Sequence, residues 1–203
     1  MSKTLYENMS DSTLWDLFLK GDMTALSVLY KEHYNLLINF GMKYCPEKDF
    51  VKDCIQDTFL KICSSNSLSH SAYVRSYLLT SLKNTMSDKL SGSRLADDLD
   101  EHFFEMYIDD SGLEELFRND DEALRLSRRL VEAYGSLRGN QRMALYLRYV
   151  RGLSYKEISK VLNIHSQSSM NLISRALASL RTRMMCSTPV IISILTTLAQ
   201  EQF

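Results

Sequence analysis

The chain of 203 residues contains little glycine and proline, with seven Gly and two Pro. These two residues mark the turns between short strands, so their scarcity argues against a protein built from many strands. Apolar residues nevertheless make up 45% of the chain, which is enough for substantial hydrophobic cores. We therefore expect an all-α fold, arranged as one large domain or two smaller ones.

Several signals of compartment and cofactor are also missing. The four cysteines, at positions 45, 54, 63 and 186, form no Cys-x-x-Cys pair and have no closely spaced histidines, so neither a zinc site nor a disulfide framework is predicted. The first residues, "MSKTLYENMSDSTLW", lack the apolar run of a secretory signal. No stretch reaches the roughly 18 apolar residues of a membrane span. We expect a cytoplasmic protein without metal, cofactor or direct membrane insertion.

Catalytic patterns are absent as well. The sequence shows no paired carboxylates, no nucleophile constellation and no phosphate-binding glycine loop. We therefore predict a binding protein, with no catalytic residues and no small-molecule substrate.

The net charge of −1 conceals blocks of very different charge. Residues 1–90 hold ten basic and ten acidic side chains, residues 91–122 hold two basic and twelve acidic ones, and residues 123–185 hold twelve basic and two acidic ones. Clustered Lys and Arg are typical of nucleic-acid-binding units, because they displace counterions from phosphates. We predict two helical domains, 1–90 and 123–185, joined by an acidic linker and followed by an apolar tail, 186–203.

Within the basic block, the segment "SYKEISKVLNIHSQSSMNLISRA" indicates two helices joined by a tight turn. Ser154 and Glu157 form a capping box, in which each side chain satisfies the other residue's backbone amide. Asn163 suits a left-handed turn at the end of the first helix, and Ile164 is expected to plug the space between the helices. This pattern predicts a helix-turn-helix unit.

The second helix of this pair presents short polar groups instead of charge. Its predicted buried face is formed by Leu172, Ile173, Ala176, Leu177 and Leu180. Its outward side chains are Gln167, Ser168, Met170, Asn171, Ser174 and Arg175. Gln and Asn can pair with adenine and Arg with guanine or phosphate, so such a helix can discriminate bases in the major groove. A helical hairpin that packs on another protein is the alternative.

Two other segments show amphipathic helices. A helix over about residues 141–151 is predicted to bury Met143, Leu147 and Val150, and to leave Arg142, Arg148 and Arg151 available. The segment "VKDCIQDTFLKIC" is predicted to bury Val51, Ile55, Phe59 and Ile62. It presents an acidic, amphipathic stripe of Asp53, Gln56, Asp57, Leu60 and Lys61.

These segments together resemble a known family. The succession "LYKEHYNLL", "DCIQDTFLK" and "RSYLLTSLKNTMSDKL" is similar to region 2 of bacterial RNA polymerase sigma factors, in the extracytoplasmic-function (ECF) group of the sigma-70 family. The segment "SLRGNQRMALYLRYVRGLSYKEISKVLNIHSQSSMNLISRALASLR" is similar to region 4 of the same family. The resemblance departs from the family pattern at Tyr77, where Trp is common, at Ser169, where an apolar residue is usual, and at Met170, where a basic residue is usual.

The resemblance implies a promoter-recognition subunit whose partners are core RNA polymerase, promoter DNA and an anti-sigma factor. The residues implied for polymerase binding are Asp53, Gln56, Asp57, Leu60 and Lys61. Those implied for the −10 element, in the loop 64–73 and the helix after it, are Ser67, His70, Tyr73, Arg75, Tyr77, Lys83 and Asn84. Those implied for the −35 element are Gln167, Ser168, Asn171, Ser174 and Arg175, with Arg142, Arg148 and Lys156 for phosphates.

Three questions stay open at this level. The acidic linker could enter the polymerase channels that later hold RNA, or fold over its own basic domain. The tail could pack on its own domain, dimerise or bind an inhibitor. A stand-alone helix-turn-helix regulator and a phage-type protein that appropriates the polymerase are the competing functions.

Overall fold

The computed structural model describes residues 6, 8–90, 114 and 118–201 of the chain. It divides into two compact units, residues 1–97 and 98–203, and each is described by itself. Every regular element among the described residues is a helix, so the predicted all-α class is confirmed.

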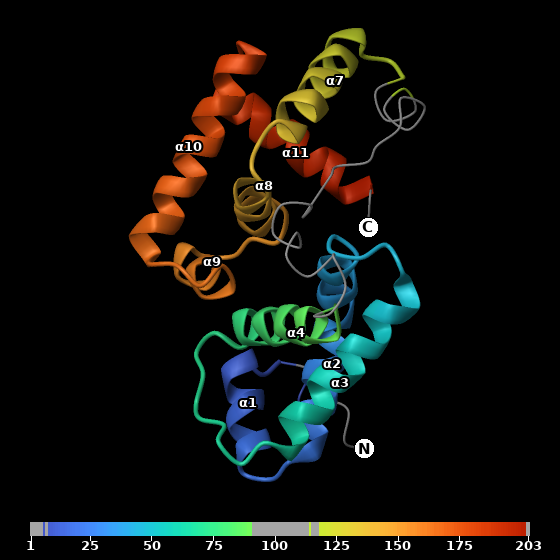
Figure 1. Cartoon of the computed structure of the whole chain (residues 1–203), viewed down its shortest axis with the longest axis vertical. Coiled ribbons are helices and arrows are strands. Elements are labelled where there is room, and N and C mark those ends of the chain that lie inside the picture. Colours follow the sequence, from blue (N-terminus) through green and yellow to red (C-terminus); the bar gives the residue numbers. More distant parts are fainter. Residues whose placement is uncertain (1–5, 7, 91–113, 115–117, 202–203) are drawn as a thin grey trace. The chain divides into compact units, whose positions relative to one another are not determined.

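The described residues of the first unit form four helices, which Figure 1 labels. They are α1 (Asp11–Leu19), α2 (Met23–Gly41), α3 (Lys48–Ser64) and α4 (Val74–Leu90). Short polar side chains fix the starts of the first two. Ser10 Oγ accepts the Thr13 amide at 3.2 Å, and Asp22 Oδ1 accepts the amides of Thr24 and Ala25. These side chains satisfy amides that have no partner inside a helix.

Helix α2 packs against α1, α3 and α4, and the apolar faces of all four helices form one core. The predicted buried stripe of α3, Val51, Ile55, Phe59 and Ile62, is confirmed. Gly41, at the end of α2, allows close approach, because a Cβ atom there would collide with the Val51 side chain. The first unit is therefore a tightly packed bundle that leaves one face of α3 outside its core.

The other helices of the described residues lie in the second unit (Figure 1). They are α7 (Asp121–Gly135), α8 (Gly139–Leu145), the π-helix η1 (Tyr146–Val150), α9 (Tyr155–Val161), α10 (Ser166–Met184) and α11 (Thr188–Glu201). Helix α10 packs against α7, α8, α9 and α11, so it is the central element of this unit.

The helix predicted over residues 141–151 differs from the one observed. It begins at Gly139 and passes into a π-helical turn, where the Arg151 amide donates to the Tyr146 carbonyl at 3.1 Å. The prediction that Val150 is buried is wrong, because this wider turn leaves it partly exposed. The prediction used a period of 3.6 residues per turn, which applies to an α-helix. It therefore could not detect the change from α-helix to π-helix.

The tail forms α11, which packs against α7, η1 and α10. Ile191, Ile194 and Leu195 are buried there. Among the alternatives raised for the tail, packing on its own unit is the one observed. None of the described helices is long and apolar enough to cross a bilayer.

Most of the predicted acidic linker, 91–122, lies outside the described residues, including its apolar cluster between residues 103 and 108. Within the described part, Arg128 Nη2 donates to Glu114 Oε1 at 2.7 Å. Asp120 then starts α7 by accepting the Ala123 amide at 2.9 Å.

Candidate polymerase-binding and promoter-binding surfaces

The stripe of α3 predicted to bind polymerase lies on the side opposite the core. Asp53, Gln56 and Lys61 are exposed, and Asp57 is partly exposed. Leu60 has 65% of its surface exposed, although it is one of the larger apolar residues of the chain. Leu60 is therefore the apolar member of a stripe whose other side chains are polar or charged.

Two members of this stripe also contact α4. Asp57 Oδ2 lies 2.6 Å from Lys89 Nζ, and Lys61 Nζ lies 3.4 Å from Asp88 Oδ2. The hydrogen bond from Lys89 to Asp57 raises the pKa of the Lys89 ammonium. Partly exposed ion pairs contribute only about 0–1 kcal/mol, so a partner could replace them at low cost.

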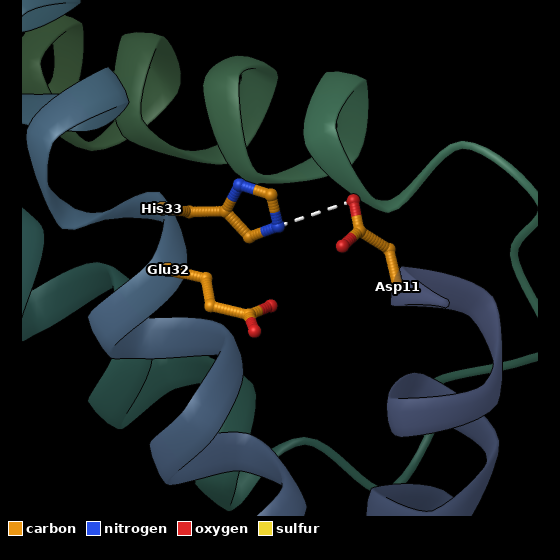
Figure 2. A group of neighbouring side chains, drawn as sticks. All are labelled: Asp11, Glu32 and His33. Atoms are coloured by element: carbon orange, nitrogen blue, oxygen red, sulfur yellow. Dashed lines mark ion pairs between the residues drawn. The ribbon is translucent and has the colours of Figure 1, made fainter. Parts of the chain in front are cut away.

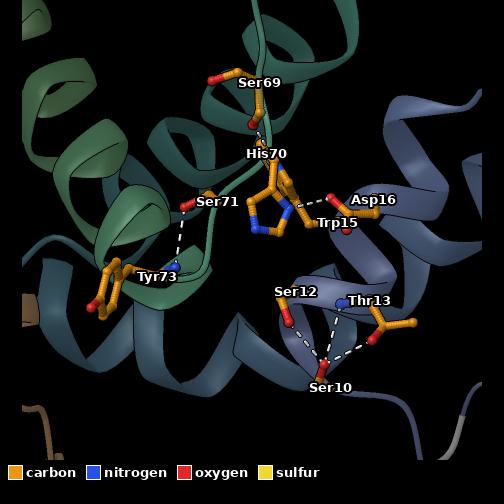
Figure 3. Close-up of polar contacts among 9 residues, drawn as sticks. All are labelled: Ser10, Ser12, Thr13, Trp15, Asp16, Ser69, His70, Ser71 and Tyr73. Carbon is orange, nitrogen blue, oxygen red and sulfur yellow. Dashed lines mark hydrogen bonds and ion pairs between the residues drawn. The ribbon is translucent and has the colours of Figure 1, made fainter.

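The loop predicted to capture a base was residues 64–73. Helix α3 ends at Ser64, so the observed loop is residues 65–73, and it is anchored by α1 (Figure 3). Trp15 Nε1 donates to the Ser69 carbonyl at 3.0 Å, and His70 Nδ1 lies 2.7 Å from Asp16 Oδ1. Ser71 Oγ accepts the Tyr73 amide at 3.2 Å immediately before α4. Ser67 is exposed, whereas Tyr73 is partly buried.

The residues predicted on α4 do not form a single exposed row. The Tyr77 ring packs edge-on against Trp15, with ring centroids 5.1 Å apart, and is partly buried. Asn84 is exposed, whereas Arg75 and Lys83 are partly buried. Tyr77 and His70 therefore both make contacts within the first unit, and their predicted roles toward DNA stay predictions.

In the second unit the predicted capping box is confirmed. Ser154 Oγ accepts the Glu157 amide at 3.3 Å, and the Ser154 amide donates to Glu157 Oε2 at 2.8 Å. Asn163 has the predicted left-handed backbone, with φ of 52°. The prediction that Ile164 plugs the space between the helices is wrong, because 36% of its surface is exposed.

Helix α10 presents the predicted polar face. Its exposed members are Gln167, Ser168, Asn171, Ser174 and Arg175. Gln167 Nε2 donates to Asn171 Oδ1 at 3.4 Å, so two predicted base-contacting amides lie side by side. On the opposite face Ile173, Ala176 and Leu180 are buried, whereas the predicted Leu172 and Leu177 are only partly buried.

The contacts of Ser169 explain why a polar residue occupies a position that is usually apolar in the family. It is fully buried, and its hydroxyl bonds the carbonyls of Tyr155 at 3.0 Å and Ser166 at 2.7 Å. The hydroxyl thereby links α10 to α9. Met170, beside it, is 43% exposed on the outer face.

The arginines predicted to stay available are used within the unit. Arg142 is only 6% exposed, and its Nη1 donates to the Gly135 carbonyl at 3.1 Å, so its prediction as a phosphate contact is wrong. Arg148 donates to the Leu153 carbonyl at 2.9 Å and lies 4.6 Å from the centroid of the Tyr155 ring.

Arg151 makes a similar internal contact. Its Nε donates to the Tyr146 hydroxyl at 2.7 Å, and burial raises the pKa of that hydroxyl. In contrast, Lys156 and Lys160 on α9 are exposed. Spacing along the sequence did not separate the exposed lysines from the internally bonded arginines. A long Arg side chain can extend along a buried surface toward a carbonyl far from its own helix face.

Comparison with known families decides the identity. The family model "Sigma-70 region 2" matches residues 29–95, and "Sigma-70, region 4" matches residues 127–180. Together they cover more than half of the chain, in the family order. The chain belongs to the sigma-70 family.

Curated relatives of this sigma-70 protein span most of its length. The ECF RNA polymerase sigma factor SigM of Bacillus subtilis (strain 168) is 25% identical over 157 residues, which is 75% of this chain and 90% of the relative. The ECF RNA polymerase sigma-E factors of Escherichia coli (strain K12) and Salmonella typhimurium (strain LT2) are each 28% identical over 165 residues, which is 77% of this chain and 85% of each relative. Sigma factors are non-enzymatic subunits of RNA polymerase.

The matched segments leave out two helices of this sigma-70 chain. Helix α1, which anchors the loop 65–73, precedes the region 2 match, and α11 follows the region 4 match. The sequence analysis did not predict that α1 holds this loop. The available signal was Trp15 itself, because a buried indole usually needs a partner for its N–H group.

One group in the first unit has the donor types of a metal site (Figure 2). Asp11, Glu32 and His33 each offer an atom, and these atoms lie within 4.8 Å of one another. His33 Nε2 lies 3.1 Å from Asp11 Oδ2, and this contact holds the pKa of the Asp11 carboxyl below its usual range. The contact with Asp11 explains why the His33 imidazole is buried, because it links α1 to α2. Glu32, the third member of the group, is exposed.

Proposed function

We propose that this chain is an ECF sigma factor that binds core RNA polymerase and directs transcription from specific promoters. The observation that carries the proposal is the order of the two family matches, each falling on its own helical unit. Polymerase supplies the catalysis, and the chain supplies recognition. This function places the protein in the cytoplasm.

In this proposal the α3 stripe binds the polymerase. Leu60 provides an apolar contact at its centre, and Asp53 and Gln56 provide polar contacts around it. An exposed apolar residue within a polar rim has the composition of a protein interface. Binding would break the contacts of Asp57 and Lys61 with α4, which are partly exposed and therefore weak.

Promoter recognition is divided between the units. The loop 65–73 and α4 recognise the −10 element, where an extruded base costs a few kcal/mol and stacking on an aromatic side chain returns about 1–3 kcal/mol. The exposed face of α10 enters the major groove at the −35 element. Gln167 and Asn171 can contact base edges there, while Lys156 and Lys160 supply attraction to phosphates.

Regulation follows from the same surfaces. An anti-sigma factor that covers the α3 stripe or the α10 face would keep the protein from polymerase or promoter. The acidic linker, if it lies in a polymerase channel, would contact surfaces that otherwise accept RNA. Charge complementarity supports this, because residues 91–122 hold twelve acidic and two basic side chains.

Reconstituted transcription tests the proposal. Purified chain and core polymerase are expected to initiate at defined promoters, whereas core polymerase alone is not. The Leu60→Asp variant is expected to lose binding to core polymerase. It should remain folded, because Leu60 lies outside the hydrophobic core of the first unit. Asp49→Asn, at the exposed start of α3, is the matched control.

A different result would support a different function. Tight, specific binding of the chain alone to promoter DNA, with no initiation when polymerase is added, would contradict the proposal. That result would favour a stand-alone helix-turn-helix regulator.

A further inference from the structure

The loop 65–73 has a composition that does not hold one conformation by itself. Its sequence, "SNSLSHSAY", contains four serines, and Leu68 is its only large aliphatic residue. Its internal bonds are local, such as the contact of Ser65 Oγ with Ser67 Oγ at 3.2 Å. A loop that receives a base must nevertheless be held closely in its binding shape. The restraint has to come from another element.

Helix α1 supplies that restraint through two consecutive residues. Trp15 Nε1 donates to the Ser69 carbonyl, and Asp16 contacts His70, so adjacent residues of the helix hold adjacent residues of the loop (Figure 3). Each contact spans 54 positions of the chain. Two such contacts in parallel fix both the position and the direction of the loop at this point.

The two contacts differ in environment. Trp15 is only 1% exposed, and its ring packs against Phe18 and Tyr77, with centroids 5.6 Å and 5.1 Å away. The indole therefore has almost no freedom, and its N–H group has a fixed direction. Asp16 and His70 have side-chain exposures of 41% and 64%, so this second contact is weakened by water and salt.

We propose that Trp15 and Asp16 are positioning residues for −10 recognition, and that Trp15 is the stronger of the two. They act through the loop and need not touch DNA. By holding residues 69 and 70, they leave Asn66 and Ser67, both exposed, as the part of the loop that faces an extruded base. A loop already held in its binding shape avoids the entropy cost of ordering it upon binding. The inference rests on the proposed function.

The test uses holoenzyme assembled from core polymerase and the full chain. A promoter library, randomised over the −35 and −10 segments, is transcribed, and the base preference is read from the templates that yield transcripts. The first variant replaces Trp15 by 3-benzothienylalanine, which keeps the size of the ring and removes the N–H donor. The others are Asp16→Ala, Asp16→Asn and the control Asp49→Asn.

We expect the Trp15 replacement to reduce discrimination at the −10 positions by about tenfold, while the −35 preference in the same pool stays as in the wild type. Asp16→Ala is expected to cause a smaller loss, which Asp16→Asn partly restores because the amide oxygen can still accept a hydrogen bond. Unchanged −10 preference in both the Trp15 and Asp16→Ala variants would overturn the inference.

Two further measurements separate this inference from its alternatives. Thermal unfolding of each variant identifies a general loss of fold, and the exposed Asp16 variants decide the question if the Trp15 replacement unfolds. Equal loss of preference at both elements would show a purely structural role and would overturn the inference. A wild-type holoenzyme that selects no promoters would instead overturn the proposed function itself.

Discussion

The loop 65–73 and helix α10 present polar side chains in opposite ways. On α10 the side chains of Gln167 and Asn171 are exposed because the apolar face of the same helix is buried beneath them. The loop has no such face, and Trp15 and Asp16 on a distant helix hold it in place. A helix therefore supports its own binding face, whereas a loop depends on residues elsewhere. Mutations far from the contact surface should affect the loop more.

The largest effect should come from removing the support inside α10. Ile173→Ala leaves a cavity under the exposed face and should cost about 2–5 kcal/mol of unfolding free energy. Urea unfolding followed by circular dichroism measures the loss. Trp15 is the only tryptophan and lies in the first unit, so its fluorescence transition should not move. A shift of both transitions would contradict this separation, and the exposed Ser174→Ala is the control.

A smaller effect should follow from changing the exposed face itself. Asn171→Ala is expected to reduce discrimination at one −35 position by about 1–3 kcal/mol, with the −10 preference unchanged. Competition between promoter variants for holoenzyme measures it.

Lys156→Ala provides the matched comparison for this exposed face. It should weaken binding to all promoters alike and lower the dependence of log affinity on log salt by about one. Loss of base preference in the Lys156 variant would contradict the division between base contacts and phosphate contacts.

Removing the capping box should have an effect of about 1 kcal/mol. Ser154→Ala deletes the hydroxyl that accepts the Glu157 amide at the start of α9, and caps contribute about 0.5–2 kcal/mol. Chemical unfolding measures the loss in the second unit. Ser159→Ala, whose hydroxyl only bonds the Lys156 carbonyl on the same helix, is the control and should change little.

The smallest effect concerns acid stability of the first unit. The hydrogen bond from His33, followed by charge attraction from His33 and Arg75, lowers the pKa of Asp11 in the folded state. The pair therefore stabilises the fold above the ordinary Asp pKa, about 3.9, and this contribution is lost as pH falls through the lowered value. In Asp11→Asn the Trp15 fluorescence midpoint in urea should depend less on pH between about 5 and 3. An unchanged pH dependence would contradict it.

The difference between loop and helix also explains what the sequence could predict. Spacing along α10 predicted its exposed polar residues and its buried Ile173, Ala176 and Leu180, because both follow from one helical period. The Ser154–Glu157 box was predicted because its partners are three residues apart.

Contacts between distant elements left no such signal. The burial of Arg142 and the contact of His70 with Asp16 depend on how helices pack, and the exposure of Ile164 depends on the angle between α9 and α10. Spacing within one helix contains no information on these arrangements. The roles of the individual site residues stay predictions until the variants above are measured.

The π-helical turn at residues 146–150 lets the chain carry one residue more without redirecting α9. A π turn holds one residue more than an α turn at the same place. Deleting one residue here, and letting the turn rewind as α-helix, should therefore keep the direction of α9 and of the base-contacting face. In an uninterrupted α-helix the same deletion would rotate everything after it by about 100°. The turn is thus a point where the second unit tolerates a change in chain length.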